Sequence, residues 1–335
     1  MYLEGLKLKS DIQKLKDLIR KSKNILITSH ENPDGDALGS MLSLGLGLKK
    51  IGKEITFYNK DGAPEILDFL PHSKDIVSSL SLVSGPFDIA FAVDCTSTIR
   101  AGIEFEEYAK SQNCKNVVII DHHETKGTDA DLHLLDKNAS STGIIIYRIL
   151  KSLGIELDKS ISENIYTTIV SDTGSFSYSN TNSDTLRIAA ELVDMGVEPS
   201  QISQALYENE PLRKLELFKL VIPTLEISED KAIASIFVDK KMFHQTDTTR
   251  QDTEGMVNIP RSIKGVDVAI LFRQEGKESD PEWKVSLRSK GRVNVAKIAE
   301  DFGGGGHARA AGCSLKGSIQ EAKDKLISSV EEALG

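Results

Sequence analysis

An acidic segment directly after an apolar run constrains this chain more than any other feature. The run Ile25–Thr28 leads into His30, and the next ten residues read Glu-Asn-Pro-Asp-Gly-Asp-Ala-Leu-Gly-Ser, with carboxylates at Asp34 and Asp36. An apolar run that stops at charged residues and gives way to helical spacing is typical of a buried strand followed by a helix. The segment therefore predicts a functional site at a strand-to-helix junction.

Imidazole and carboxylate groups at this spacing indicate a metal site. Such ligands suit Mn²⁺ or Mg²⁺, and a catalytic pair of these cations needs carboxylates that can bridge them. Pro33 and Gly35 shape the backbone between the ligands, because proline fixes φ and glycine accepts conformations closed to other residues. A helix that starts directly behind the acidic residues also presents backbone N–H groups to an anion. A polar turn with a helix cap is the alternative interpretation.

Two further apolar runs end in residues of the same kind. The run Phe87–Val93 ends at Asp94, and Val117–Ile120 ends at the sequence Asp-His-His of residues 121–123. Such runs are typical of strands that are covered on both faces of a parallel sheet. Because ligands bind outside the carboxyl ends of parallel strands, we expect the three strand ends to converge on one site.

A fourth acidic candidate, Asp172, ends the helical pattern of Ser162–Val170 within the sequence Ser-Asp-Thr-Gly. Each candidate also has a structural explanation, since Asp94 could cap a helix, the histidines could form a polar turn and Asp172 could end a helix. These explanations require independent coincidences at corresponding positions. We therefore favour a metal site.

The order of predicted elements favours an α/β fold. Strand patterns at Asn24–His30 and Glu54–Asn59 flank a helical pattern at Ala37–Lys50, and this alternation indicates a parallel sheet. The length of 335 residues fits about two domains. We expect a parallel-sheet domain with helices on both faces at residues 1–185, a helical connector at 186–215 and a smaller α/β domain at 216–335. Within the connector, we expect one helix from Gln201 to Pro211.

Two patterns near the C-terminus suggest phosphate binding. Four glycines and a histidine, Gly303–His307, follow a helical pattern, and their backbone N–H groups can cradle a phosphate. In the predicted strand Trp283–Lys290, alternation places Ser286 and Arg288 on one face, where a guanidinium can bind phosphate. A flexible turn and a solvated strand face are the alternatives. The candidate substrate contacts are Ser286, Arg288, Gly304, Gly305, Gly306, His307 and, six residues after Asp94, Arg100.

The composition limits the partners. With 41 basic and 50 acidic residues the net charge is −9, which disfavours a long contact with duplex nucleic acid but allows a small phosphorylated ligand held by metals. No run approaches the ~18 apolar residues of a membrane span. The three cysteines are widely spaced, with no metal or disulfide pattern. We expect a cytoplasmic protein without a membrane partner.

Together these motifs resemble the DHH phosphoesterase superfamily. The likeness rests on His30 to Ser40, Asp94, Asp121-His122-His123 and Asp172, and Gly303–His307 followed by Ala310-Ala311-Gly312 resembles the DHH-associated domain of the RecJ-like branch. Length and layout are most similar to the NrnA-like group of bifunctional oligoribonucleases and pAp phosphatases. Members of that group cleave very short RNA to mononucleotides and convert adenosine 3′,5′-bisphosphate to AMP with manganese.

The resemblance implies a site for two Mn²⁺ ions, with Mg²⁺ as the alternative. It implies that one ion is held by His30 and Asp34, the other by Asp36 and His122, and that Asp94 and Asp172 are shared. His123 would contact the scissile phosphate or assist the leaving oxygen, so that His123 and Asp94 act in catalysis, and Asp121 would support the histidines. The implied substrates are short single-stranded RNA and a nucleotide bisphosphate.

Other functions remain open at this point. A cyclic di-AMP phosphodiesterase is the nearest alternative, because similar two-domain members of the superfamily act on cyclic dinucleotides. A non-catalytic nucleotide sensor is a second, although every expected metal ligand is present. The glycine and histidine segment argues against a pyrophosphatase of this superfamily, and the chain length argues against a processive RecJ-type exonuclease. The sequence leaves a homodimer open.

Overall fold

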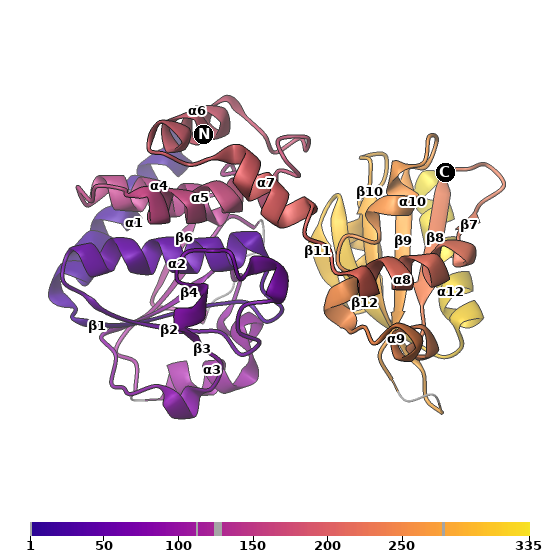
Figure 1. The fold of residues 1–335 in the computed structure, drawn as a ribbon, viewed down its shortest axis with the longest axis horizontal. Coiled ribbons are helices and arrows are strands. Elements are labelled where there is room, and N and C mark those ends of the chain that lie inside the picture. The colour runs from indigo at the N-terminus through magenta and orange to yellow at the C-terminus, as the bar shows by residue number, and fades with distance from the viewer. Residues whose placement is uncertain (1, 112, 124–128, 277–278) are drawn as a thin grey trace. The chain divides into compact units, whose positions relative to one another are not determined.

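The computed structural model describes residues 2–111, 113–123, 129–276 and 279–335. The chain divides into two compact units, Met1–Asn209 and Glu210–Gly335. Each unit is built around its own six-stranded sheet (Figure 1), which confirms the predicted α/β fold with a second, smaller α/β part. Within the described residues, no helix combines the length and the apolar composition that crossing a bilayer requires.

All paired strands of the first sheet run parallel, in the order β3-β2-β1-β4-β5-β6. The chain builds the sheet outward from β1 through β2 and β3, and then returns to the other side of β1 with β4. In such sheets a ligand binds outside the carboxyl ends of the two strands where the order reverses, here β1 and β4. The strands are β1 (Asn24–Ser29), β2 (Glu54–Tyr58), β3 (Ile76–Val77), β4 (Ile89–Val93), β5 (Val117–Asp121) and β6 (Leu132–Leu135).

Helices cover both faces of this sheet, as predicted. On β1, Ile25 and Ile27 belong to one apolar cluster and Leu26 to another, because successive side chains point to opposite faces. Figure 1 shows α2, α4 and α5 along one face and α3 along the other. The helices of the unit are α1 (Tyr2–Lys21), α2 (Gly35–Lys50), α3 (Ile103–Lys110), α4 (Thr142–Ser152), α5 (Lys159–Asp172), α6 (Ser183–Asp194) and α7 (Pro199–Tyr207).

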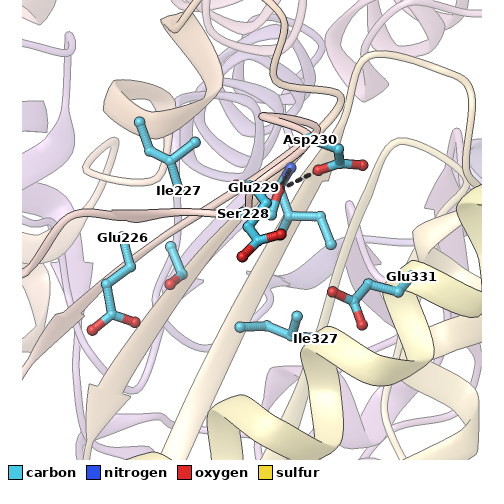
Figure 2. Close-up of a pocket in the computed structure, with 9 residues that line it drawn as sticks. Glu226, Ile227, Ser228, Glu229, Asp230, Ile327 and Glu331 are labelled. Atoms are coloured by element: carbon cyan, nitrogen blue, oxygen red, sulfur yellow. Dashed lines mark hydrogen bonds between the residues drawn. The ribbon is translucent and has the colours of Figure 1, made fainter.

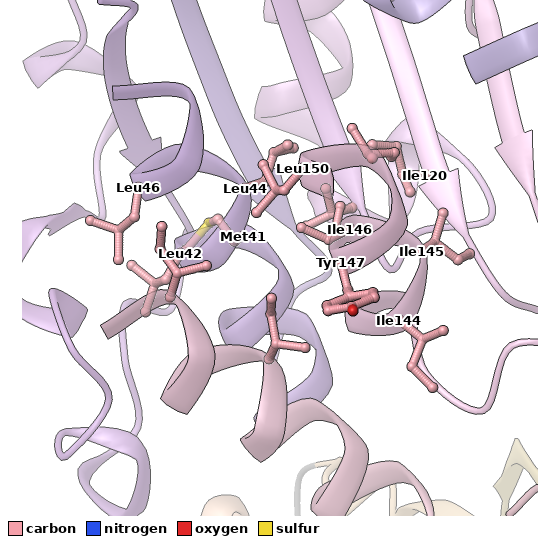
Figure 3. Packing of buried hydrophobic residues seen from close by; sticks show 14 of the residues in the cluster. Met41, Leu42, Leu44, Leu46, Ile120, Ile144, Ile145, Ile146, Tyr147 and Leu150 are labelled. Atoms are coloured by element: carbon pink, nitrogen blue, oxygen red, sulfur yellow. The ribbon is translucent and has the colours of Figure 1, made fainter. Parts of the chain in front are cut away.

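Helix α2 lies at the centre of the helical layer, and every residue from Gly35 to Leu48 is buried. Figure 3 shows its apolar side chains packed with those of α4 and with Ile120 of β5. A Cβ atom added at Gly39 would lie 2.6 Å from the carbonyl oxygen of Asn164, and one added at Gly35 would lie 2.9 Å from Ser171. The glycines thus let α2 approach α5 closely, and the start of α2 meets the end of α5.

The second unit has a mixed sheet in the order β11-β12-β10-β9-β8-β7, in which only the pair β8–β9 is parallel. Its apolar residues form one cluster with α11 and α12 and another with α8 and α9. The strands are β7 (Glu226–Ile227), β8 (Ile233–Val238), β9 (Val268–Gln274), β10 (Glu282–Ser289), β11 (Gly305–His307) and β12 (Ala310–Lys316). The helices are α8 (Leu212–Val221), α9 (Lys240–Thr246), α10 (Asn258–Ser262), α11 (Val295–Asp301) and α12 (Ile319–Leu334).

Some local expectations were right and others wrong. On β10, the side chains of Trp283, Val285 and Leu287 are buried, and the alternation predicted for this strand is confirmed. The helix predicted from Gln201 to Pro211 is wrong, because α7 ends at Tyr207 and α8 starts at Leu212. The physical reason is Pro211, which disfavours a helical conformation in the residue before it and stands at the N-terminus of α8. Helices α6 and α7 pack into the first core, whereas α8 packs into the second.

Candidate functional site

The carboxyl ends of three neighbouring strands bring the first candidate residues together. His30 follows β1, Asp94 follows β4, and His122 follows β5. The Nε2 atom of His30 lies 3.5 Å from Oδ2 of Asp94, and Nε2 of His122 lies 3.7 Å from Oδ1 of the same residue. Asp94 therefore presents one carboxylate oxygen to each imidazole.

The contact between α2 and α5 adds three carboxylates to this cluster. Asp34 precedes α2 and caps it, with Oδ1 accepting the N–H groups of Asp36 and Ala37 at 3.0 Å, which confirms that it has a structural role. Nε2 of His30 is 4.0 Å from Oδ1 of Asp34. Nε2 of His122 is 3.6 Å from Oδ2 of Asp36 and 3.5 Å from Oδ2 of Asp172, the last residue of α5.

The six residues form two groups that could each hold a cation. One group contains His30, Asp34 and Asp94, the other contains Asp36, His122 and Asp172, and within each group the ligating atoms lie within 4.8 Å of one another. One imidazole and two carboxylates suit Mn²⁺ or Mg²⁺. Since Asp94 also contacts His122 in the second group, its carboxylate is placed to bridge two cations.

Backbone carbonyl groups orient both histidines of the two candidate metal groups. Nδ1 of His30 lies 2.8 Å from the carbonyl oxygen of Glu31, and Nδ1 of His122 lies 3.3 Å from that of Ala139. A carbonyl only accepts hydrogen bonds, so Nδ1 carries a proton and Nε2 faces the carboxylates. This arrangement is typical of histidines that bind metals. The Nδ2 group of Asn59 also donates to the carbonyl oxygen of His30 at 3.0 Å.

Asp121 holds the loop that carries the two adjacent histidines. Its Oδ1 accepts the N–H groups of His122 and His123 at 2.8 and 3.3 Å, and it lies 2.6 Å from Nδ1 of His123. Burial alone would lower the pKa of His123, but the hydrogen bond to Asp121 and the charge of Asp94 raise this pKa to about 9. His123 is therefore a cation at neutral pH, half-buried beside the carboxylates.

Four crowded carboxylates favour bound cations electrostatically. Burial, followed by the charges of Asp94 and Asp172, raises the pKa of Asp36 well above its usual value. Burial likewise raises the pKa of Asp172 to about 7, opposed by His122 and His123 and reinforced by Asp94 and Asp34. Burial would also raise the pKa of Asp94, but the neighbouring histidines hold it below its usual range. Buried like charges are costly unless they are paired, and divalent cations would pair them.

Sequence reasoning missed the N-terminus of α4, which contacts two of these carboxylates. The N–H groups of Thr142 and Gly143 donate to Oδ2 and Oδ1 of Asp36 at 2.8 and 3.1 Å. The hydroxyl of Thr142 donates to Oδ1 of Asp94 at 2.9 Å. The signal for this contact was the polar sequence Ser-Ser-Thr-Gly directly before the apolar residues 144–146, a pattern that predicts a helix start.

The candidate contacts in the second unit share one face of its sheet. Arg288 and His307 both pair with Ala310, and Ser286 and Gly305 both pair with Gly312, so two cross-strand rows run over β10, β12 and β11. Directly paired residues place their side chains on the same face. Arg288 and His307 therefore flank small residues of β12 on this face.

The glycine segment differs from the predicted phosphate cradle. The N–H group of Gly304 donates to the carbonyl oxygen of Ala299 at 2.8 Å, and that of Gly303 donates to Glu300 at 3.0 Å. Two of the N–H groups expected to bind phosphate thus close the end of α11. Gly306 has a φ of 143° and faces β12 so closely that a Cβ atom would lie 2.5 Å from the carbonyl oxygen of Ala310. Glycine is required there for the turn into the hairpin.

Arg100 lies beside the first strand end. It belongs to a 3₁₀-helix, Thr98–Ala101, and its carbonyl oxygen accepts the N–H group of Glu31 at 2.8 Å. Glu31 directly follows His30, and the side chain of Arg100 is exposed. The structure thus places this candidate next to the loop that carries the first histidine.

A pocket in the second unit, of about 490 Å³, is a different kind of site (Figure 2). It lies beside β7, β8 and α12, and none of the predicted site residues lines it. Four of its nine lining residues are acidic, which disfavours an anionic substrate by charge repulsion. They are Glu226, Glu229, Asp230 and Glu331.

Comparison with known proteins agrees with the two-unit structure. The family model described as the DHH family, N-terminal domain, matches residues 24–171, and the model of the DHHA1 domain matches residues 230–335. A bifunctional oligoribonuclease and PAP phosphatase from Thermus thermophilus is 30% identical over 92% of this chain and 90% of its own length. The protein of the same name from Bacillus subtilis is also 30% identical, over 92% and 93%. The crystal structure of an exopolyphosphatase-related protein from Bacteroides fragilis superposes with a TM-score of 0.86 at 28% identity, covering 97% of this chain and 96% of that one.

Proposed function

This chain belongs to the DHH family, and on that premise we propose that it is a metal-dependent phosphoesterase that hydrolyses short oligoribonucleotides to mononucleotides and adenosine 3′,5′-bisphosphate to AMP. The observation that carries the proposal is the position of Asp94, whose two oxygens each face one imidazole, one in each candidate metal group. Relatives named for both activities align with more than nine-tenths of the chain. Their names support the choice of substrates.

The side chains of the first unit have distinct proposed roles. His30 and Asp34 hold one divalent cation, Asp36 and His122 hold the other, and Asp94 and Asp172 serve both. When bound at such a site, Mn²⁺ or Mg²⁺ supplies a water of lowered pKa and neutralises charge on the phosphate.

His123 is the proposed contact to the reacting phosphate. Its pKa, raised to about 9, keeps the imidazole positively charged at neutral pH. The hydrogen bond between Nδ1 and Asp121 fixes the orientation of the ring, and the proposed contact to an anionic oxygen is made through Nε2. A charged donor in this position stabilises negative charge that develops on the leaving oxygen.

The second unit is the proposed source of further substrate contacts. Ser286, Arg288 and His307 share one face of its sheet, with the small residues Ala310 and Gly312 between them. A guanidinium binds a phosphate through two parallel hydrogen bonds, and the small residues beside it are proposed to lie against a flat nucleobase. We propose that this face binds a terminal phosphate or nucleotide of the substrate.

A substrate panel tests the proposal. The purified protein is incubated with Mn²⁺ and adenosine 3′,5′-bisphosphate, a dinucleotide RNA, a pentanucleotide RNA, a long RNA, cyclic di-AMP or pyrophosphate, and released phosphate and nucleotides are quantified. We expect turnover of the bisphosphate and the short RNAs. Asp94→Ala is the negative control. A preference for cyclic di-AMP would refute the substrate assignment, and inactivity on all six compounds would refute the enzymatic function.

A further inference from the structure

One buried residue, Thr142, contacts carboxylates from both candidate metal groups. Its hydroxyl donates to Oδ1 of Asp94 at 2.9 Å, and its backbone N–H group donates to Oδ2 of Asp36 at 2.8 Å. Thr142 is fully buried, and it is the first residue of α4, whereas Ser141 occupies the capping position. The hydroxyl is therefore directed at the carboxylate.

The hydroxyl controls the one rotation that decides whether Asp94 can serve two cations. A carboxylate turns easily about its terminal torsion, because the energy wells of this torsion are broad. In the structure Oδ2 faces His30 and Oδ1 faces His122. The hydrogen bond from Thr142 takes one lone pair of Oδ1 and leaves the other available. Rotation of the carboxylate away from this orientation would break the hydrogen bond.

The hydroxyl of Thr142 can also donate its hydrogen bond to Asp94 while His30 and His122 bind cations. His30 and His122 approach Asp94 through their Nε2 atoms, which are the atoms they offer to a cation. A nitrogen that ligates a cation cannot donate a hydrogen bond at the same time. The contact with Thr142 uses no ligating atom of a histidine, so it can hold Asp94 both before and after metals bind.

Packing against α5 keeps the first turn of α4 in place. The Oγ atoms of Ser141 and Thr168 lie 3.0 Å apart. A Cβ atom added at Gly143 would lie 2.0 Å from Oγ1 of Thr168, so the side chain of Thr168 packs directly against the backbone of α4. Thr142 thus lies on a helix turn that is held by packing, and a residue that positions another side chain requires such support.

We propose that Thr142 is a positioning residue, which holds the Asp94 carboxylate in the orientation that lets it bridge two cations. This inference rests on the proposed function, because it assumes that the two groups bind metal. Loss of the Thr142 hydroxyl is expected to weaken metal binding as well as turnover. The cation next to His122 should be affected most, because the hydroxyl contacts Oδ1 of Asp94, the oxygen that faces His122.

The test compares three variants, all of which keep the hydrogen bond from the backbone N–H group of residue 142 to Asp36. Thr142→Val removes the hydroxyl at nearly constant shape, Thr142→Ala removes it without β-branching, and Thr142→Ser retains it. Mn²⁺ binding to each metal-free protein is measured by isothermal titration calorimetry. We expect the valine and alanine variants to bind one Mn²⁺ about tenfold more weakly, as the loss of one hydrogen bond to a charged group implies, and the serine variant to stay within about threefold of the wild type.

Two further readouts separate positioning from a structural role. With saturating Mn²⁺ and adenosine 3′,5′-bisphosphate, we expect the valine variant to lose about tenfold or more in kcat with little change in KM. In EDTA, its melting temperature should fall, because one hydrogen bond to a buried carboxylate is lost, and the increase caused by Mn²⁺ should also be smaller than in the wild type. A variant that loses stability equally with and without Mn²⁺ would show that Thr142 only supports the fold.

The outcomes keep the two proposals distinct. If the wild type binds Mn²⁺ and the valine or alanine variant binds it equally well, the positioning role of Thr142 is refuted and the proposed function stands. If the wild type neither binds Mn²⁺ nor hydrolyses any compound of the panel, the proposed function fails. Recovery of Mn²⁺ affinity and kcat in Thr142→Ser, together with their loss in both other variants, would support the positioning role.

Discussion

Replacing Asp172 by asparagine should stabilise the metal-free protein while it weakens metal binding. The pKa of Asp172 is raised to about 7, mainly by burial and further by the charges of Asp94 and Asp34, with His122 and His123 acting in the opposite direction. A carboxyl group whose pKa is higher in the folded than in the unfolded protein destabilises the fold when it ionises. Asparagine removes that cost because it has no charge.

The pKa values set the size and the pH range of this effect. Each unit of pKa corresponds to about 1.4 kcal/mol, so a rise from 3.8 to about 7 would cost the folded protein about 4 kcal/mol at most. The side chain is 30% exposed and solvent screens part of the cost, so we expect Asp172→Asn to stabilise by about 1 to 3 kcal/mol. The gain should be absent near pH 4, grow as the pH rises and be complete above about pH 7.

Thermal unfolding in EDTA measures this gain. A stability change of 1 kcal/mol shifts the melting temperature of a domain of this size by about 2 to 4 °C, so the variant should melt several degrees higher at pH 8 and similarly to the wild type at pH 4. Added Mn²⁺ should raise the melting temperature of the wild type more than that of the variant. A variant that is less stable than the wild type in EDTA at pH 8 would refute the reasoning.

Asp88→Asn is the matched control, with the opposite sign. Asp88 accepts hydrogen bonds from Lys115 Nζ at 2.8 Å and from the N–H group of Lys23 at 2.7 Å, and these contacts, with the ammonium group first, lower its pKa to about 2. Its ionised form stabilises the fold above pH 4, and this contribution is lost as the pH falls from about 4 to 2. The variant should therefore melt below the wild type at pH 8, with no change in the effect of Mn²⁺.

Three further outcomes are expected. Asp94→Ala should reduce kcat by at least about a thousandfold and abolish tight binding of a second Mn²⁺ in calorimetry. The reason is that His30 and His122, one in each candidate metal group, lose the carboxylate that faces them. Near wild-type turnover would contradict the assignment. Arg288→Ala should raise KM by about tenfold or more and change kcat little. The control Arg292→Ala removes an exposed ion pair with Asp267 and should leave both parameters unchanged. Equal effects of the two substitutions would exclude a specific role for Arg288. Mn²⁺ should bind more tightly as the pH rises from about 6 to 9, because it must displace a proton from His30. Burial lowers the pKa of His30, but the nearby carboxylates raise it to about 9. Calorimetric binding heats that do not depend on the ionisation enthalpy of the buffer would show that no proton is released.

The sequence was most informative where a ligand follows directly from the end of a strand. His30, Asp94 and the histidines at 122 and 123 could be grouped without coordinates, because parallel strands place their carboxyl ends at one edge of the sheet. Asp34 and Asp36 lie on the first turn after β1 and followed from the same argument. The alternation of buried and exposed side chains along β10 could be predicted for a similar reason, because successive side chains of a strand point to opposite faces of the sheet.

Contacts between distant elements were decided by tertiary structure alone. Thr142 meets Asp94 and Asp36 because glycines let α2 and α4 pack closely with α5, and no local pattern encodes which helix start meets which carboxylate. The glycine segment at 303–306 shows the same limit. Its composition allows a phosphate cradle, but hydrogen bonds to α11 and pairing with β12 already use part of its backbone.

The sequence by itself thus determined which side chains make up the candidate site, because the residue types and their places at strand ends are local properties of the chain. Tertiary structure decided the arrangement of those ligands, including which oxygen of Asp94 faces which histidine and which hydroxyl holds it. The physical reason is that orientation depends on hydrogen bonds and packing between elements far apart in sequence. Such contacts exist only once the helices have packed on the sheet.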